Sequence, residues 1–265
     1  MFATRLISGI LLLAAAVVCV CLGGPVLFAV TAVISFIGLF EFYRVLAIEK
    51  KAVAVAGYLA AAGWFLLLYL GQESRMTFVF IALLMVLMAI YVFTFPKYRT
   101  EEITEAFFGV CYVPVMLSFL YQTRQMEDGF LLAWLIFASS WGCDTCAYCV
   151  GRLFGRHKLA PVLSPKKSIE GAVGGVVGAA LIGFLLGVAF QGGMELDNSP
   201  LVCALACAIG AAISQIGDLA ASAVKRNHNI KDYGNLIPGH GGILDRFDSM
   251  IFTAPAIYFA IIFLR

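Results

Sequence analysis

Charged and polar side chains gather in one stretch of an otherwise apolar chain, from Ser222 to Asp248. This stretch reads SAVKRNHNIKDYGNLIPGHGGILDRFD and holds three Asp, two Lys, two Arg, two His and four Gly. An apolar run that contains Asp218 precedes it, and a second apolar run follows it. Carboxylates are the ligands that Mg²⁺ prefers, and interleaved cations neutralise phosphate oxygens. The pattern therefore predicts a site for a metal and a charged substrate, as phosphoryl or nucleotidyl transfer requires.

The segment Pro238–Gly242 within this stretch is rich in glycine. Three Gly in four residues let main-chain N–H groups approach an anion closely. His240 either contacts a phosphate or caps the loop, and the sequence leaves both interpretations open.

A second polar cluster runs from Gly151 to Gly171 and reads GRLFGRHKLAPVLSPKKSIEG, with five Lys or Arg. Its segment Ser164–Ser168 leads directly into an apolar run. A helix N-terminus flanked by Ser and Lys is a ready anion site, so we expect a phosphate to bind here. For Arg152, Arg156 and Lys158, a polybasic patch on anionic lipid headgroups is an equally good interpretation.

The composition indicates the elements that must position these residues. Hydrophobic residues make up 62% of the 265 residues and charged residues 13%, whereas soluble domains are about a quarter charged. Apolar runs of about 20 residues recur, enough to cross a hydrocarbon core of about 30 Å as helices. We expect an all-α polytopic membrane protein, with an N-terminal run that is a first span rather than a signal peptide. The nine predicted spans cover approximately 6–23, 25–46, 52–70, 76–95, 103–121, 129–150, 169–190, 200–223 and 249–264.

The basic residues predict how these spans are oriented. With nine spans, three of the 18 Lys and Arg fall on one side, at Arg75, Arg124 and Arg265. The other fifteen, Arg5 among them, share the side of the N-terminus. Because cytoplasmic loops carry an excess of Lys and Arg, the N-terminus is predicted to be cytoplasmic.

Four carboxylates come from the last spans, where buried charge is costly and usually functional. Asp144 is predicted about two turns from the inner end of its span, and Asp218 roughly 27 Å along its own. Asp245 and Asp248 are predicted just before the last span begins. The four then gather at one depth on the cytoplasmic side. The alternative is that each Asp only pairs with a neighbouring Lys or Arg.

We accordingly divide the chain into two parts. Residues 1–128 form N-terminal transmembrane helices, which are spans one to five. Residues 129–265 form a C-terminal catalytic transmembrane region with cytoplasmic loops. Span seven carries Gly171/Gly175 and Gly174/Gly178, a small-xxx-small spacing that lets helices pack closely. The eight Cys lie in apolar runs and are expected to pack as small hydrophobes.

The polar stretches resemble a known family. The matching positions are Ser222-x-Val224-Lys225-Arg226, Lys231-Asp232-x-Gly234 and Ile237-Pro238-x-His240-Gly241-Gly242-Ile243-x-Asp245-Arg246-Phe247-Asp248. Upstream they are Asp144-Thr145-x-Ala147-Tyr148, Gly151-Arg152-x-Phe154-Gly155 and Ser164-Pro165-Lys166-Lys167-Ser168-x-Glu170-Gly171. Over about 140–250 the chain is similar to the phosphatidate cytidylyltransferases, the CDP-diacylglycerol synthases.

The resemblance implies an enzyme that joins phosphatidate to CTP and yields CDP-diacylglycerol and pyrophosphate. It also implies Mg²⁺ held by Asp218 and Asp245, a second cation such as K⁺, and a homodimer. The expected catalytic residues are Asp218, Asp245, Lys225 and Arg246. The expected substrate-binding residues are Asp144, Lys166, Lys167, Ser168, Ser222, Arg226, Lys231, Asp232, His240, Gly241, Gly242 and Asp248.

The expected setting is the cell membrane, plasma or inner, with the active site facing the cytoplasm. CTP, phosphatidate and membrane lipids are the expected partners, and nucleic acid is not. A CTP-dependent lipid kinase of the dolichol or phytol kinase type is the alternative in related chemistry. A cation-coupled transporter is the alternative from another class, and it predicts charges near the bilayer midplane and paired repeats.

Overall fold

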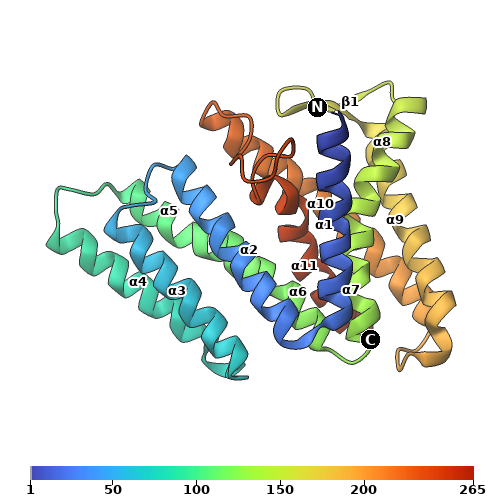
Figure 1. The fold of residues 1–265 in the computed structure, drawn as a ribbon, viewed down its shortest axis with the longest axis horizontal. Coiled ribbons are helices and arrows are strands. Elements are labelled where there is room, and N and C mark those ends of the chain that lie inside the picture. The colour runs from blue at the N-terminus through green and yellow to red at the C-terminus, as the bar shows by residue number, and fades with distance from the viewer. Residues whose placement is uncertain (1) are drawn as a thin grey trace. The chain divides into compact units, whose positions relative to one another are not determined.

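The computed structural model describes residues 2–265, with side chains from Ser8 onward. Arg5, counted above among the cytoplasmic cations, lies outside the described side chains. The chain is almost entirely helical (Figure 1). It forms two compact units. Unit 1 comprises residues 2–11, Pro25–Ser118 and Asp232–Arg246, and unit 2 comprises Leu12–Gly24, Phe119–Lys231 and Phe247–Arg265.

Unit 1 is built mainly from four helices. They are α2 (Gly24–Val45), α3 (Ala52–Tyr69), α4 (Met76–Phe93) and α5 (Thr100–Val110), with a short turn, η1 (Glu73–Arg75), before α4. The helices α3, α4 and α5 pack against one another (Figure 1). A π-helical turn, η2 (Cys111–Val115), contains Pro114 and leads into α6 (Met116–Gln125). In this interior, Trp64 Nε1 donates to Ser118 Oγ at 3.0 Å.

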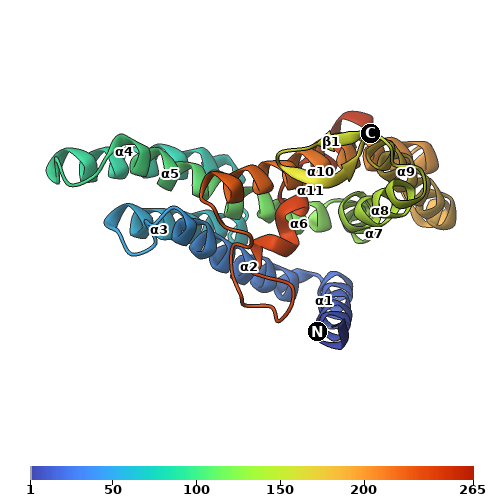
Figure 2. The same cartoon turned by 90° about the horizontal axis from the view of Figure 1, so that it is seen from above.

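Unit 2 carries the second set of helices and a small hairpin. Its elements are α7 (Gly129–Phe137), the π-helical turn η3 (Ala138–Gly142), α8 (Cys143–Phe154), β1 (Lys158–Ala160), β2 (Ser164–Ser168), α9 (Ile169–Phe190), η4 (Gln191–Gly193) and α10 (Ser199–Asn227). Most of α11 (Leu244–Leu264) also belongs to it, as does the second half of α1 (Phe2–Leu22). Helix α9 packs against both α8 and α10, and the hairpin lies at one end of α8 and α9 (Figure 2).

Small residues allow α9 to pack closely on both neighbours. A Cβ atom added to Gly175 would lie 2.8 Å from the Sγ of Cys143 in α8, and one added to Gly183 would lie 2.7 Å from the Sγ of Cys207 in α10. The opposite face of α9 exposes Val173, Val177 and Leu181. The small-xxx-small packing predicted for this helix is therefore confirmed, and its exposed apolar face suits contact with lipid.

The predicted all-α membrane fold is confirmed. Among the described residues, eight helices are long and apolar enough to cross a membrane, and the described apolar part of α1, Ser8–Leu22, is shorter. The count of nine spans and the cytoplasmic N-terminus stay predictions. The functional division at residue 128 also stays a prediction. The β1–β2 hairpin was not predicted, because its residues are mostly polar and show no strand alternation.

The predicted start of the last span was wrong by five residues. Helix α11 begins at Leu244, so Asp245 and Asp248 lie inside its first turns and not before it. The hydropathy pattern locates the apolar part of a span, but a helix begins where its first N–H groups find acceptors. Here the N–H group of Leu244 donates to a side chain of α2, which the pattern does not contain.

The close packing of α8 and α9 can be tested by filling it. Gly175→Leu should lower the free energy of unfolding by about 1–3 kcal/mol, because the side chain has to displace Cys143 and Ala147. The measurement is thermal unfolding in detergent micelles. Val173→Leu, on the exposed face of the same helix, is the matched control and should leave the unfolding temperature unchanged. Equal unfolding temperatures for the two variants would contradict the packing.

Candidate functional site

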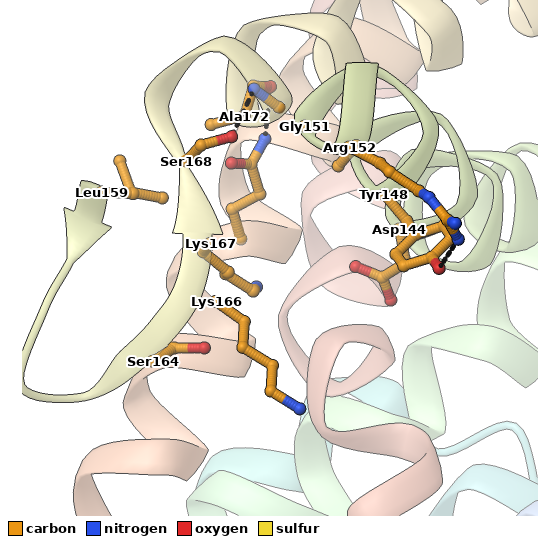
Figure 3. Close-up of a pocket in the computed structure, with 13 residues that line it drawn as sticks. Asp144, Tyr148, Gly151, Arg152, Leu159, Ser164, Lys166, Lys167, Ser168 and Ala172 are labelled. Carbon is orange, nitrogen blue, oxygen red and sulfur yellow. Dashed lines mark hydrogen bonds between the residues drawn. The ribbon is translucent and has the colours of Figure 1, made fainter. Parts of the chain in front are cut away.

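Unit 2 contains a pocket of about 410 Å³ (Figure 3). This volume lies within the range of about 300–1,000 Å³ that is usual for small-molecule sites. Its lining comes from α8, the β1–β2 hairpin, the start of α9, and α10. The lining residues are Asp144, Ala147, Tyr148, Gly151, Arg152, Leu159, Ser164, Lys166, Lys167, Ser168, Gly171, Ala172 and Gln215.

The hairpin is tied to the start of α9, and this fixes the lysines that it carries. Lys158 of β1 is paired with Ser168 of β2 in the antiparallel register. The hydroxyl oxygen of Ser168 accepts from the N–H group of Gly171 at 3.1 Å, so Ser168 is the N-cap of α9. Two residues further, Glu170 accepts from the N–H group of Arg156 at 3.0 Å and hydrogen-bonds His157 Nδ1 at 2.6 Å.

Opposite charges face each other across the pocket. Lys167 extends from the hairpin strand towards Asp144 on α8, and Lys166 lies beside Lys167 on the same strand (Figure 3). Asp144, Tyr148 and Arg152 are four residues apart, so they share one face of α8. Arg152 Nη1 donates to the hydroxyl of Tyr148 at 3.0 Å. The pocket therefore presents three cations and one carboxylate at its rim.

Lys167 and Asp144 connect the pocket to a cluster of carboxylates and lysines. Lys167 Nζ forms an ion pair with Asp218 Oδ2 of α10, and both side chains are about a quarter exposed. Asp248 of α11 has Asp218, Lys225 and Asp144 as its charged neighbours. Lys225 is 9% exposed. Three of the four carboxylates predicted to gather thus lie in one charged cluster within unit 2.

The fourth carboxylate, Asp245, lies in unit 1 at the end of the glycine-rich segment. Its side chain is 5% exposed. Its Oδ2 atom accepts from the N–H group of Tyr233 at 2.7 Å and from that of Gly242 at 2.9 Å. The N–H group of Gly242 thus binds the protein's own carboxylate. Contact of Gly241 and Gly242 with substrate stays a prediction.

Glu41 of α2 was not predicted from the sequence, yet it binds the residues directly before Asp245. It is 3% exposed, and its two carboxylate oxygens accept from the N–H groups of Ile243 at 3.1 Å and Leu244 at 2.9 Å. The signal was present, because Glu41 is an acid inside a predicted span. The rule that singled out Asp144 applies to it equally.

The other predicted residues are distributed as follows. The Oγ atom of Ser8 lies 2.7 Å from Nδ1 of His240 and donates to the carbonyl of Pro238 at 3.2 Å. The Nε atom of Arg246 is buried and has no hydrogen-bond partner among the described residues, as expected of a donor that a ligand satisfies. Ser222 is buried, whereas Arg226, Lys231 and Asp232 are exposed.

Comparison with known proteins assigns the chain to a family. The profile of the cytidylyltransferase family matches residues 3–264. The chain belongs to the cytidylyltransferase family. It is therefore an enzyme, a nucleotidyltransferase, and the resemblance predicted from its polar stretches is confirmed.

Individual relatives carry a more specific name. A phosphatidate cytidylyltransferase of Staphylococcus saprophyticus is 31% identical over 242 residues, which cover 89% of each chain. One of Synechocystis is 31% identical over 289 residues, or 98% of this chain and 96% of the relative. One of Bacillus subtilis is 36% identical over 169 residues, or 63% of this chain and 59% of the relative.

The chemistry of the carboxylates fits the Mg²⁺ ion expected for this cytidylyltransferase. Mg²⁺ sites in enzymes that act on phosphates usually have one or two carboxylates and complete their shell with substrate and water. In keeping with this, no three His, Cys, Asp or Glu side chains of the described chain converge to form a complete metal site. Asp218 and Asp245 belong to different units, so their joint ligation of a metal stays a prediction.

The role of Glu170 in holding the hairpin can be tested by proteolysis. In Glu170→Ala the N–H groups of Arg156 and His157 lose their acceptor, so trypsin should cleave within residues 156–167 about tenfold faster. Cleavage sites and rates are measured by mass spectrometry of the protein in micelles. Glu195→Ala, which removes an exposed acid of the same unit, should cleave at the wild-type rate. Unchanged cleavage in Glu170→Ala would show that the hairpin is held by other contacts.

Proposed function

We propose that this cytidylyltransferase transfers the cytidylyl group of CTP to phosphatidate, giving CDP-diacylglycerol and pyrophosphate. The observation that carries the proposal is the pocket that Lys166, Lys167 and Arg152 line together with the carboxylate of Asp144. Such a site suits a phosphate group held beside a metal. The names of relatives that align over almost the whole chain support the choice of substrates.

The proposed reaction is an in-line displacement at phosphorus. An oxygen of the phosphatidate phosphate forms a bond to the α-phosphorus of CTP. The bond from that phosphorus to the oxygen bridging to the β-phosphate breaks, and pyrophosphate leaves with the bridging oxygen. Because the attacking oxygen is already anionic, no strong general base is required. The protein then has to align the two phosphates and neutralise their charge.

The charged residues divide this work between them. Lys166, Lys167 and Arg152 bind phosphate oxygens at the pocket. Lys167 is held towards the pocket by Asp218 before substrate arrives, so a phosphate meets a cation already in place. Lys225 offsets the charge of Asp248 within the buried cluster. When bound, Mg²⁺ supplies further neutralisation of phosphate charge, and Asp218 and Asp245 are the residues that would hold it, with a second cation such as K⁺ nearby.

The proposed setting is the cytoplasmic face of the cell membrane. The protein is a multi-pass membrane protein by its helices. The excess of Lys and Arg on one side of the predicted topology supports a cytoplasmic site, and CTP is found in that compartment. A homodimer is also proposed, on the family resemblance.

The proposal is tested by the products formed in detergent micelles from phosphatidate, CTP and Mg²⁺. The wild-type protein should release pyrophosphate together with CDP-diacylglycerol. Asp218→Asn and Asp245→Asn should each lower kcat by about a hundredfold or more, because each removes a carboxylate that would hold Mg²⁺, the ion that neutralises phosphate charge in the transition state. Asp197→Asn, at an exposed position of unit 2, is the control and should keep wild-type activity.

Other outcomes point to the alternative functions. CDP as the nucleotide product, with one phosphate added to the lipid acceptor, would indicate a CTP-dependent lipid kinase that acts at the γ-phosphorus. A folded wild-type protein without any turnover would contradict the proposed reaction and favour transport.

A further inference from the structure

Helix α2 holds both ends of the segment that leads into α11. We define the glycine loop as residues 233–243, which contain Gly234, Gly239, Gly241 and Gly242. At its far end, the two oxygens of Glu41 accept from the N–H groups of Ile243 and Leu244. At its near end, Arg44 Nη2 donates to the carbonyl of Tyr233 at 2.7 Å. Glu41 and Arg44 are three residues apart, so one side of α2 makes both contacts.

Asp245 depends on the same two ends of the glycine loop. Its Oδ2 atom accepts from the N–H group of Tyr233, whose carbonyl Arg44 binds. The same atom accepts from the N–H group of Gly242, the residue before Ile243, which donates to Glu41. Both of these hydrogen bonds to Asp245 are therefore adjacent in the chain to a contact with α2.

Glu41 leaves no room for a side chain at two positions of the glycine loop. A Cβ atom added to Gly234 or Gly242 would overlap the carboxylate of Glu41. The absence of a side chain at both positions thus lets a buried carboxylate enter the loop. The anion that these two glycines approach closely is a carboxylate of the protein itself.

The charge of Glu41 matches its surroundings. It lies at the N-terminus of α11, where the first N–H groups of a helix have no intrahelical acceptor and the helix dipole favours a negative charge. A buried carboxylate is costly unless it is hydrogen-bonded, and both oxygens of Glu41 are. A glutamine in its place would offer one acceptor oxygen and would turn an NH₂ group towards the other N–H.

We propose that Glu41 is a positioning residue that fixes the glycine loop and through it the carboxylate of Asp245. Both of its carboxylate oxygens already accept main-chain N–H groups, so in this proposal it acts through the loop. The link to catalysis rests on the proposed function, in which Asp245 binds Mg²⁺. The link to the loop rests on the contacts alone.

The test compares Glu41→Gln with a matched control, Glu102→Gln. Glu102 also accepts an N–H group at a helix start, that of Arg99 before α5, and pairs with Lys51 in the same unit. Three quantities are measured in micelles: amide hydrogen exchange of peptides covering 233–246, Mn²⁺ binding by electron paramagnetic resonance, and the Mg²⁺ dependence of kcat and KM. The first two do not depend on turnover.

In Glu41→Gln we expect exchange in the glycine loop to rise about tenfold to a hundredfold, the range that charge-assisted hydrogen bonds are worth. Mn²⁺ binding should weaken about tenfold, and the half-saturating Mg²⁺ concentration should rise in proportion. Glu102→Gln should lower the unfolding temperature but leave all three quantities at wild-type values. Glu41→Asp, which keeps the charge, should recover part of the loss.

Several results would overturn the proposal or confine it. Wild-type loop exchange and wild-type Mn²⁺ affinity in a folded Glu41→Gln protein would refute it. If Glu41→Gln does not fold, Arg44→Met takes its place, because Arg44 is exposed yet holds the other end of the loop. Arg44→Met should also speed hydrogen exchange of the loop and weaken Mn²⁺ binding. If the wild-type protein releases no pyrophosphate, the proposed function fails, while loop exchange and Mn²⁺ affinity still report on Glu41.

Discussion

The cost of placing charge in an apolar chain governs this structure. Transfer of a carboxylate or ammonium group from water into the protein interior costs several kcal/mol of free energy unless the group gains a partner. With 62% hydrophobic residues, the chain has little polar surroundings to offer. Each of its inner carboxylates is accordingly paired. Glu41 and Asp245 bind main-chain N–H groups, and Asp218 binds Lys167.

The two units solve this problem in different ways. In unit 1 Glu41 and Asp245 bind N–H groups of the backbone, which cannot leave without local unfolding. In unit 2 the partner of Asp218 is the flexible side chain of Lys167, which in the proposed function exchanges the carboxylate for a phosphate oxygen. The first arrangement gives a rigid loop, and the second gives cations that are ready to bind a substrate. Nucleotidyl transfer by charge neutralisation needs both properties.

The sequence alone determined the fold class, the family and the identity of the polar residues. Apolar runs of about 20 residues allow few structures other than membrane-spanning helices, because only a helix satisfies its backbone within one segment. The motif from Ser222 to Asp248 predicted the cytidylyltransferase family from the types and spacing of its residues. Small residues spaced four apart predicted the packing face of α9. These features are local, so a linear pattern contains them.

The tertiary structure alone decided which groups are partners. The residues that Glu41 binds lie about two hundred positions later in the chain, so no local pattern connects an acid in α2 with the start of α11. The same contact explains why α11 begins at Leu244, five residues before its apolar part predicts. The hairpin was missed for a similar reason. It is held by contacts of Ser168 and Glu170 at the start of α9, and not by an alternating pattern of apolar residues that the sequence would reveal. Hydropathy reports how much of a segment avoids water, whereas the position of a hydrogen-bond acceptor depends on the folded chain.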